Sequence, residues 1–276
     1  MGDQRRDRIE VDVGVAAGVS DRGRRRHRNE DDLALRGLTP LQDGMAAAVA
    51  IVCDGVSSGA RPEDASDAAV RAAAEAMVTV LRADQDPVTA THAALRAADQ
   101  AVTELADEEP AGWNAPACTF VSAVVVGGTA TVGWVGDSRA YWIPQPRAET
   151  MPPARLTEDD SWLAQVVAAG ELSVGEATAD PRAHAITAWL GAAAECAVPH
   201  LVTIEPGSPG VVVICTDGLW NYLDDAAELA AALPAQALEA PLDAARELVD
   251  VALRCGGRDN VTVAVLPLGI QPGGTP

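Results

Sequence analysis

The order of strand-like and helix-like segments constrains the fold of this chain most strongly. Apolar runs between residues 118 and 143 follow one another directly, and Gly127-Gly128 is typical of a hairpin turn. Helical patterns come in pairs, first at residues 63–82 and 87–106. Strands in hairpin-like runs and helices in pairs indicate an α+β fold, not the alternating order of a doubly wound sheet. Two antiparallel sheets packed face to face, with helix pairs outside, would accommodate this order.

The rest of the chain continues with further strand-like and helix-like segments. Further strands are expected at residues 9–15, 45–53, 197–204, 211–215 and 261–266, and further helices at 225–233 and 241–255. Residues 161–191 predict a short helix and a long, partly irregular excursion. Because no linker or internal repeat divides the chain, we expect one domain over residues 1–276. Its core should span about 9–268, with frayed tails at 1–8 and 271–276.

Composition and charge exclude several classes of function. The formal net charge of −20 opposes general nucleic-acid binding, and no lysine is present for a Walker A motif or a Schiff base. No stretch approaches the roughly 18 apolar residues that span a membrane, so we expect a cytoplasmic protein. Five scattered cysteines without a Cys-x-x-Cys motif oppose a thiolate metal site or a disulfide framework. Cys53 and Cys215, within apolar runs, should be reduced core thiols.

Acidic residues stand at the ends of five separate apolar runs: Asp54, Asp137, Asp217, Asp259 and the pair Glu30-Asp31. One such aspartate would be explained as a turn or helix-cap residue. Five of them at one end of a sheet would repel each other unless cations neutralise them. Oxygen-only sites suit Mg²⁺ or Mn²⁺, and shared carboxylates suggest two metal ions that activate water.

The segment Arg22-Gly-Arg-Arg-Arg-His-Arg28 is the one basic island in this acidic chain. This segment has three possible explanations: a solvated run of charges, a nucleic-acid-binding patch, or the binding site of an anionic substrate. The negative net charge of the chain opposes the second. The third interpretation fits best, because the planar guanidinium of arginine suits phosphate. Metal ions, activated water and a phosphate-binding arginine together indicate hydrolysis of a phosphoester.

These residues follow the order of the motifs of a known family. The motifs are Ser20-Asp-x-Gly…Arg26…Asn29-Glu-Asp31, Val52-Cys-Asp-Gly55, Gly136-Asp-Ser-Arg139, Thr157-x-Asp-x-Ser161, Leu190-Gly191, Thr216-Asp-Gly-Leu-Trp220 and Asp259-Asn-Val-Thr262. From about Val11 to Val265 the chain resembles the metal-dependent protein phosphatases (PPM, or type 2C, serine/threonine phosphatases), in their bacterial form. The resemblance implies an α-β-β-α sandwich that removes phosphate from serine and threonine of proteins with Mn²⁺ or Mg²⁺. A hydroxide bridging two metal ions would attack phosphorus without a phosphoenzyme. The resemblance identifies the excursion at 161–191 with a flap beside the active site.

The resemblance also implies the metal ligands. Asp54 would bridge the two metal ions, and the backbone carbonyl of Gly55 would bind the first. Asp217 and Asp259 would bind the second. Asp137, together with Asp217, would serve a third, weaker site found in bacterial members.

Further roles follow from the same resemblance. Arg26 would bind the phosphate of the substrate and, with Asp54, be catalytic. Glu30 and Asp31 would orient the metal ligands, and Asn260 would hold the Asp259 loop. The partners would be phosphorylated proteins, substrates of a Ser/Thr kinase, with no nucleic acid and no membrane. The protein itself would be a monomer.

One departure from the family motif concerns the residues after Asp54. Where many members have two glycines and a nearby histidine, this chain has Val56-Ser57-Ser58-Gly59. In some members that histidine is the proposed general acid, so the role would fall to a water or another group. The change also motivates an alternative, a phosphatase-fold binding module with little activity. A phosphatase of sigma-factor regulators is a third possibility, although Arg26 and the Asn29-Glu-Asp31 pattern favour the first.

Overall fold

Two antiparallel sheets face each other in the structure, a computed structural model that describes residues 7–38, 46–106, 115–145, 152–192 and 198–269. One sheet has the strand order β1-β2-β11-β10-β7-β8 and the other β3-β4-β5-β6-β9. The strands are β1 (Arg8–Asp12), β2 (Ala17–Asp21), β3 (Asp31–Leu38), β4 (Ala47–Asp54), β5 (Phe120–Val126), β6 (Thr129–Val135), β7 (Arg139–Pro144), β8 (Ala154–Arg155), β9 (His200–Ile204), β10 (Gly210–Cys215) and β11 (Val261–Leu268).

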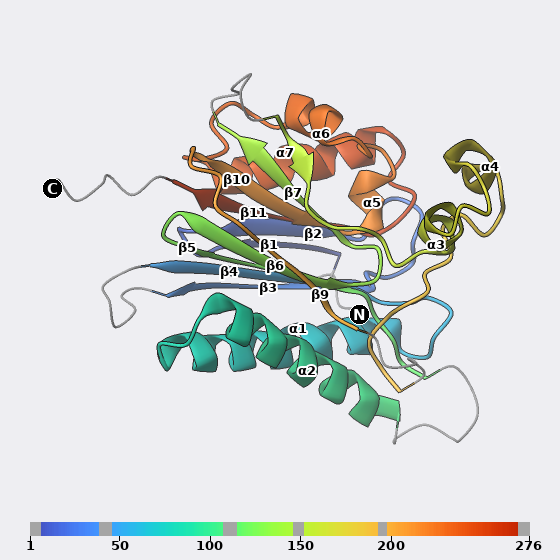
Figure 1. The fold of residues 1–276 in the computed structure, drawn as a ribbon, viewed down its shortest axis with the longest axis horizontal. Coiled ribbons are helices and arrows are strands. Elements are labelled where there is room, and N and C mark those ends of the chain that lie inside the picture. Colours follow the sequence, from blue (N-terminus) through green and yellow to red (C-terminus); the bar gives the residue numbers. More distant parts are fainter. Residues whose placement is uncertain (1–6, 39–45, 107–114, 146–151, 193–197, 270–276) are drawn as a thin grey trace, which may run out of the picture.

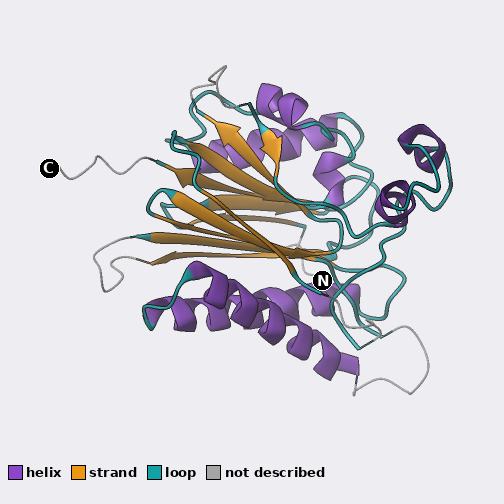
Figure 2. Cartoon of the chain, in the orientation of Figure 1, coloured by secondary structure: helices purple, strands orange, loops and turns teal. Residues whose placement is uncertain are grey.

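Helices cover the outer faces of both sheets, which gives four layers (Figures 1 and 2). The helices are α1 (Pro62–Arg82), α2 (Pro87–Ala106), α3 (Trp162–Ala168), α4 (Val174–Thr178), α5 (Asp217–Trp220), α6 (Ala226–Ala232) and α7 (Pro241–Arg254). Helices α1 and α2 lie against the five-stranded sheet, whereas α5, α6 and α7 lie on the side of the six-stranded sheet. The predicted fold class, an α-β-β-α sandwich, is confirmed.

The central strands are apolar along their whole length because both of their faces are buried. In β4, Val49 and Ile51 pack in the cluster under α1 and α2, whereas Ala48 and Ala50 pack between the two sheets. A strand with one solvated face would alternate apolar and polar residues instead. The unbroken run before Asp54 therefore follows from the position of β4 inside the sandwich.

Several elements differ from the prediction. Strands β2 and β3, the two-residue strand β8 and helices α4 and α5 were not expected, and β1 already begins at Arg8. Arg8 is not part of a frayed tail, since its guanidinium donates to Asp21 at 3.2 Å. Residues 1–6 and 271–276 lie outside the described ranges, so the other tail predictions and the single domain over 1–276 stay predictions. None of the described helices is both long and apolar enough to cross a lipid bilayer.

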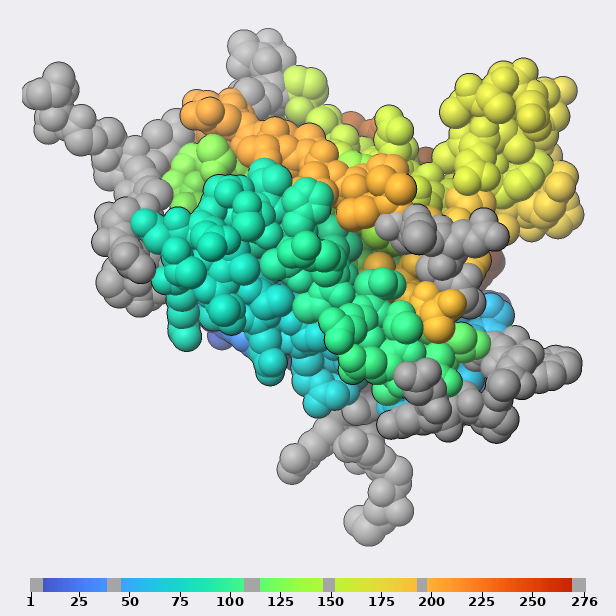
Figure 3. Space-filling model, turned by 60° about the horizontal axis from the view of Figure 1, so that its bottom comes forward, coloured from blue at the N-terminus to red at the C-terminus, as the bar shows by residue number. Residues whose placement is uncertain are grey.

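The predicted excursion at 161–191 carries α3 and α4 and protrudes from one end of the sandwich (Figures 1 and 3). Ser161 caps α3, and Ser173 and Glu176 form a capping box at α4. The base of the excursion is closed by backbone contacts, because Trp162 N donates to Ala185 O at 2.8 Å. We call residues 161–191 the flap.

Candidate active site

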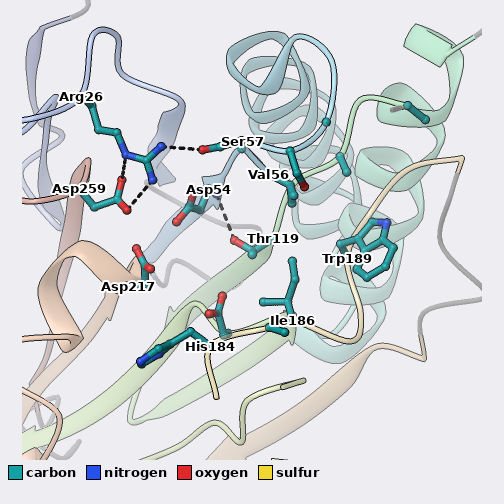
Figure 4. A pocket seen from close by; sticks show the side chains of 17 residues that line it. Arg26, Asp54, Val56, Ser57, Thr119, His184, Ile186, Trp189, Asp217 and Asp259 are labelled. Carbon is teal, nitrogen blue, oxygen red and sulfur yellow. Dashed lines mark hydrogen bonds and ion pairs between the residues drawn. The ribbon is translucent and has the colours of Figure 1, made fainter. Parts of the chain in front are cut away.

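All five predicted metal ligands, four aspartates and Gly55, line one cavity of about 670 Å³, together with Arg26. Asp54 ends β4, Asp137 lies in the turn between β6 and β7, Asp217 begins α5 and Asp259 precedes β11. Figure 4 shows that the side chains of Asp54, Asp217 and Asp259 approach the same space from different segments of the chain. The sandwich thus gathers carboxylates that are far apart in the sequence.

The register of the five-stranded sheet places Asp31 directly opposite Asp54. The Asp31 carboxylate is buried, and its Oδ2 accepts hydrogen bonds from the hydroxyls of Thr216 at 2.9 Å and Thr262 at 2.7 Å. Its Oδ1 has no hydrogen-bond partner among the described residues, and the same holds for Oδ1 of Asp217. Two buried carboxylate oxygens without donors are costly unless a cation or a proton satisfies them.

Burial and mutual repulsion weaken the acidity of these carboxyl groups. Burial, with the neighbouring aspartates, raises the pKa of Asp54 well above its usual range. The same causes raise the pKa of Asp137 to about 8, of Asp31 to about 7 and of Asp217 to about 6. Like charges that share a low-dielectric site disfavour ionisation, and bound cations reverse this effect.

The residues present fit divalent metal ions by charge and by donor type. All the predicted ligands offer oxygen, as Mg²⁺ and Mn²⁺ prefer, and two of the buried oxygens lack donors. No group of three His, Cys, Asp or Glu side chains within the described ranges, however, forms a ready-made metal cluster. In the cavity, the carboxylate of Asp259 forms an ion pair with Arg26 (Figure 4).

Arg26 lies at the edge of the carboxylate group and makes a two-pronged ion pair. Its Nε and Nη2 contact Oδ1 and Oδ2 of Asp259 at 2.6 and 2.7 Å, and its Nη1 donates to Ser57 Oγ at 2.8 Å. Ser57 Oγ in turn donates to Glu30 at 2.5 Å, and Glu30 lies 3.7 Å from Arg26. The hydrogen bonds to Asp259 raise the pKa of Arg26, so its charge is permanent.

The side chain of Asn260, the residue predicted to hold the Asp259 loop, contacts the basic turn. Its side-chain amide donates to the backbone oxygens of Arg22 at 2.8 Å and Arg28 at 2.9 Å, and its Oδ1 accepts from the backbone NH of Glu30 at 2.9 Å. Asn260 thereby closes the basic turn on which Arg26 stands. The sequence motif identified the residue but not its partners.

Gly55 is required for packing as well as for its predicted metal contact. A Cβ atom at this position would lie 2.3 Å from the backbone oxygen of Pro62 and 2.8 Å from that of Glu30. The backbone NH of Gly55 donates to Glu30 O at 3.0 Å. The absence of a side chain therefore lets three segments meet behind Asp54.

Asp137 is held in place by contacts on both sides of its turn. Trp220 Nε1 donates to the backbone oxygen of Asp137 at 2.9 Å, and Arg139 stacks over the Trp220 ring at 3.7 Å. Asp160 accepts from the backbone NH of Gly136 at 2.9 Å. Asp160, the residue before the flap, thus connects the base of the flap to the Asp137 turn.

The cavity also contains residues that the sequence analysis did not select. Ser57 contacts Arg26, while Thr119 accepts a hydrogen bond from the backbone NH of Asp54 at 3.1 Å. From the flap and its end, His184 and Trp189 line the same cavity. The serines at 57 and 58, where many family members have glycines, are the one sequence signal that could have pointed to Ser57. No sequence signal pointed to His184 and Trp189, because the folding of the chain brings the flap to the cavity.

Comparisons with known proteins agree with this geometry. A family model described as protein phosphatase 2C matches residues 21–251. The chain belongs to the protein phosphatase 2C family. It is thus a metal-dependent protein phosphatase, and the resemblance noted in the sequence is confirmed.

The phosphatase is similar to several named bacterial proteins. It shares 27% identity over 256 residues with the serine/threonine phosphatase stp of Listeria monocytogenes, covering 90% of this chain and 93% of that protein. It also shares 28% identity with the serine/threonine protein phosphatase PstP of Mycobacterium tuberculosis, over 90% of this chain but 44% of the relative. It therefore corresponds to less than half of PstP.

Two solved structures match the fold along nearly the whole chain. The phosphatase MsPP of Mycobacterium smegmatis, in complex with cacodylate, has a TM-score of 0.72 and 29% identity, covering 94% of this chain and 100% of that one. The catalytic domain of PstP in complex with two manganese ions has a TM-score of 0.69 and 26% identity, covering 92% and 97%. The predicted use of Mn²⁺ or Mg²⁺ as the cofactor agrees with the manganese of the second structure.

Proposed function

We propose that the phosphatase hydrolyses phosphoserine and phosphothreonine of proteins in the cavity lined by Asp54, Asp137, Asp217 and Asp259. The observation that carries this proposal is the meeting of these four carboxylates with Arg26 in one cavity of about 670 Å³. Carboxylates alone would repel a phosphate dianion, so the site requires cations, and Arg26 supplies a fixed one beside them.

Asp54, the carbonyl of Gly55, Asp217 and Asp259 would hold two divalent cations, and Asp137 with Asp217 would hold a third. When bound, these cations supply an activated water at neutral pH and offset the charge that develops on the phosphoryl oxygens. Asp54 is suited to bind both cations, because it ends β4 opposite Asp31 and faces the cavity.

The task of Arg26 is to hold the phosphoryl group in line for attack. Its guanidinium presents parallel N–H donors that match two phosphoryl oxygens. In the structure those donors are taken by Asp259, so the carboxylate and the substrate compete for the same arginine. The hydrogen bonds of Asn260 to the turn limit how far Arg26 can move.

The proposed activity is tested with p-nitrophenyl phosphate and a phosphothreonine peptide. We expect hydrolysis of both in the presence of Mn²⁺, complete loss with a chelator and recovery when Mn²⁺ is restored. This phosphatase should hydrolyse the peptide more slowly than related enzymes do, because no histidine closely follows Asp54 in the sequence to protonate a poor leaving group. Absence of turnover on both substrates with Mn²⁺ over a broad pH range would instead support the weakly active binding module.

Ser57 should set the affinity for substrate, because its hydroxyl bridges Arg26 and Glu30. We expect Ser57→Ala to raise the KM for p-nitrophenyl phosphate about three- to tenfold with little change in kcat, since loss of a charge-assisted hydrogen bond loosens the arginine. Ser58→Ala, at the neighbouring cavity position, is the matched control. Equal KM values for the two variants would exclude this role of Ser57.

We also propose that the protein acts in the cytoplasm, as a monomer, on substrates of a Ser/Thr kinase. Its described thiols support a reducing compartment, because Cys53, Cys118, Cys215 and Cys255 are free and the first three are buried. The sigma-factor alternative uses the same carboxylates, and phosphopeptides from the two substrate classes would separate them.

A further inference from the structure

The basic turn of the sequence lies against the loop that carries Asp259. Arg24 N donates to Gly257 O at 2.8 Å, and Asn260, next to Asp259, holds the turn at Arg22 and Arg28. The turn and this loop therefore form one edge of the active-site cavity, with Arg26 and Asp259 on the cavity side.

The arginines of this edge fall into two groups. Arg22 pairs with Asp7 at 3.0 Å, Arg26 with Asp259 and Arg28 with Glu63. Arg24, Arg25 and Arg258 are exposed instead, and none of their guanidinium groups has an ion-pair or hydrogen-bond partner among the residues that the structure describes. We call these three residues the rim arginines.

The rim arginines gather positive charge at one place in an acidic chain. The net charge is −20, with 40 acidic and 20 basic residues, so acidic partners are plentiful elsewhere on the surface. Fold stability does not explain three unpaired guanidinium groups next to the substrate cavity. Charge complementarity explains them if an anionic part of the substrate lies along this edge.

We propose that the rim arginines bind a second phosphoryl group on the same substrate segment, near the phosphorylated residue that is being hydrolysed. This inference rests on the proposed function and deepens it. Two positions along the chain separate Arg24 from Arg26, so their Cα atoms lie at most about 7 Å apart. An extended peptide advances about 3.3 Å per residue, so a second phosphorylated residue two to four positions away reaches this edge.

A phosphoryl group fits this surface better than a carboxylate or a nucleic acid. A dianion with three acceptor oxygens can engage more than one guanidinium at once, through paired N–H donors. A nucleic acid presents a long row of phosphates, which requires a longer basic track and would meet the acidic surface beyond the turn. The three rim arginines match one compact anion.

The test compares phosphothreonine peptides that differ two to four positions from the scissile residue. That position carries threonine, glutamate or a non-hydrolysable phosphonate analogue of phosphothreonine, so that only one phosphate can leave. We expect kcat/KM of the intact phosphatase with Mn²⁺ to be about tenfold higher for the phosphonate peptide than for the threonine peptide. The gain should shrink with added salt, because exposed charges are screened.

The variants Arg24→Ala, Arg25→Ala and Arg258→Ala, singly and combined, should remove this preference. Arg96→Ala is the matched control, since Arg96 is an exposed arginine of α2. Hydrolysis of p-nitrophenyl phosphate, which has no second anion, should be the same in all these variants and the wild type.

Other results of these experiments would show which of the two proposals, the rim site or the proposed function, is wrong. If p-nitrophenyl phosphate is hydrolysed but the second anion gives no advantage, the rim proposal is overturned and the proposed function stands. If no substrate is hydrolysed, the proposed function fails first. An equal gain from glutamate would overturn the phosphoryl assignment in favour of an acidic segment. Tight binding of a single-stranded oligonucleotide that the combined variant loses, without any peptide preference, would replace it with a nucleic-acid site.

Discussion

Replacing Asp54 with alanine should lower the rate of p-nitrophenyl phosphate hydrolysis by roughly 10³-fold or more. Asp54 ends β4 opposite Asp31 and faces the cavity shared with Asp137, Asp217 and Asp259. A side chain in this central position would contact both proposed cations, so its loss should weaken both sites together. Initial rates with Mn²⁺ and calorimetric titration of Mn²⁺ measure the two effects separately.

The fold of the Asp54→Ala variant should survive. Burial and the neighbouring aspartates raise the pKa of Asp54 well above its usual range, so without cations its removal relieves repulsion. Its melting temperature in a chelator should equal or exceed that of the wild type. Asp243→Ala, on the exposed first turn of α7, controls for loss of a carboxylate and should keep full activity. An Asp54→Ala variant as active as the wild type would refute the assignment of the site.

The phosphatase in a chelator should lose stability as the pH rises from about 5 to 8. Asp217, Asp31 and Asp137 have pKa values raised to about 6, 7 and 8 by burial and by their neighbours, against about 3.9 for unfolded aspartate. In this range the folded protein retains protons that the unfolded chain has released. The free energy of unfolding therefore decreases as the pH rises through these pKa values and each carboxyl group of the folded protein ionises.

Bound cations should reverse this pH dependence, because they stabilise the ionised carboxylates. Thermal melts at several pH values measure both effects, and each kcal/mol corresponds to about 2–4 °C for a domain of this size. Asp137→Asn should flatten the slope, whereas the exposed Asp243→Asn should not. Asp180, whose pKa its hydrogen bonds with Arg182 lower to about 2, affects stability only at more acidic pH. A melting temperature that is constant or rises with pH in the chelator would contradict the proposed carboxylate cluster.

Most of the fold could be predicted because its pattern is local. Helices α1 and α2 have long amphipathic segments that begin at proline, and the hairpin of β5 and β6 has a turn of two glycines. Strands β2 and β3 were missed because their short sequences mix apolar residues with Ser20, Asp32 and Arg36. Pairing with β11 and β4 makes them strands, and this pairing is not visible in a local pattern.

The site could be predicted in its residue types but not in its contacts. The motifs pointed to Asp54, Asp217 and Asp259, and all three line the cavity. They did not predict that Asn260 closes the basic turn or that Ser57 bridges Arg26 and Glu30. These contacts join segments up to 238 positions apart, and sequence spacing carries no information on them.

The sequence by itself determined the layers of the fold and the chemistry of the site. Apolar periodicity places each segment on a buried or exposed face, and carboxylates at strand ends in an ordered set of motifs specify an oxygen-rich metal site. Only the tertiary structure decided which charges neutralise each other. Arg26 is paired with Asp259, whereas the guanidinium group of the neighbouring Arg24 has no ion-pair partner among the described residues. Electrostatic attraction depends on distance in space, and that distance is set by the packing of the two sheets.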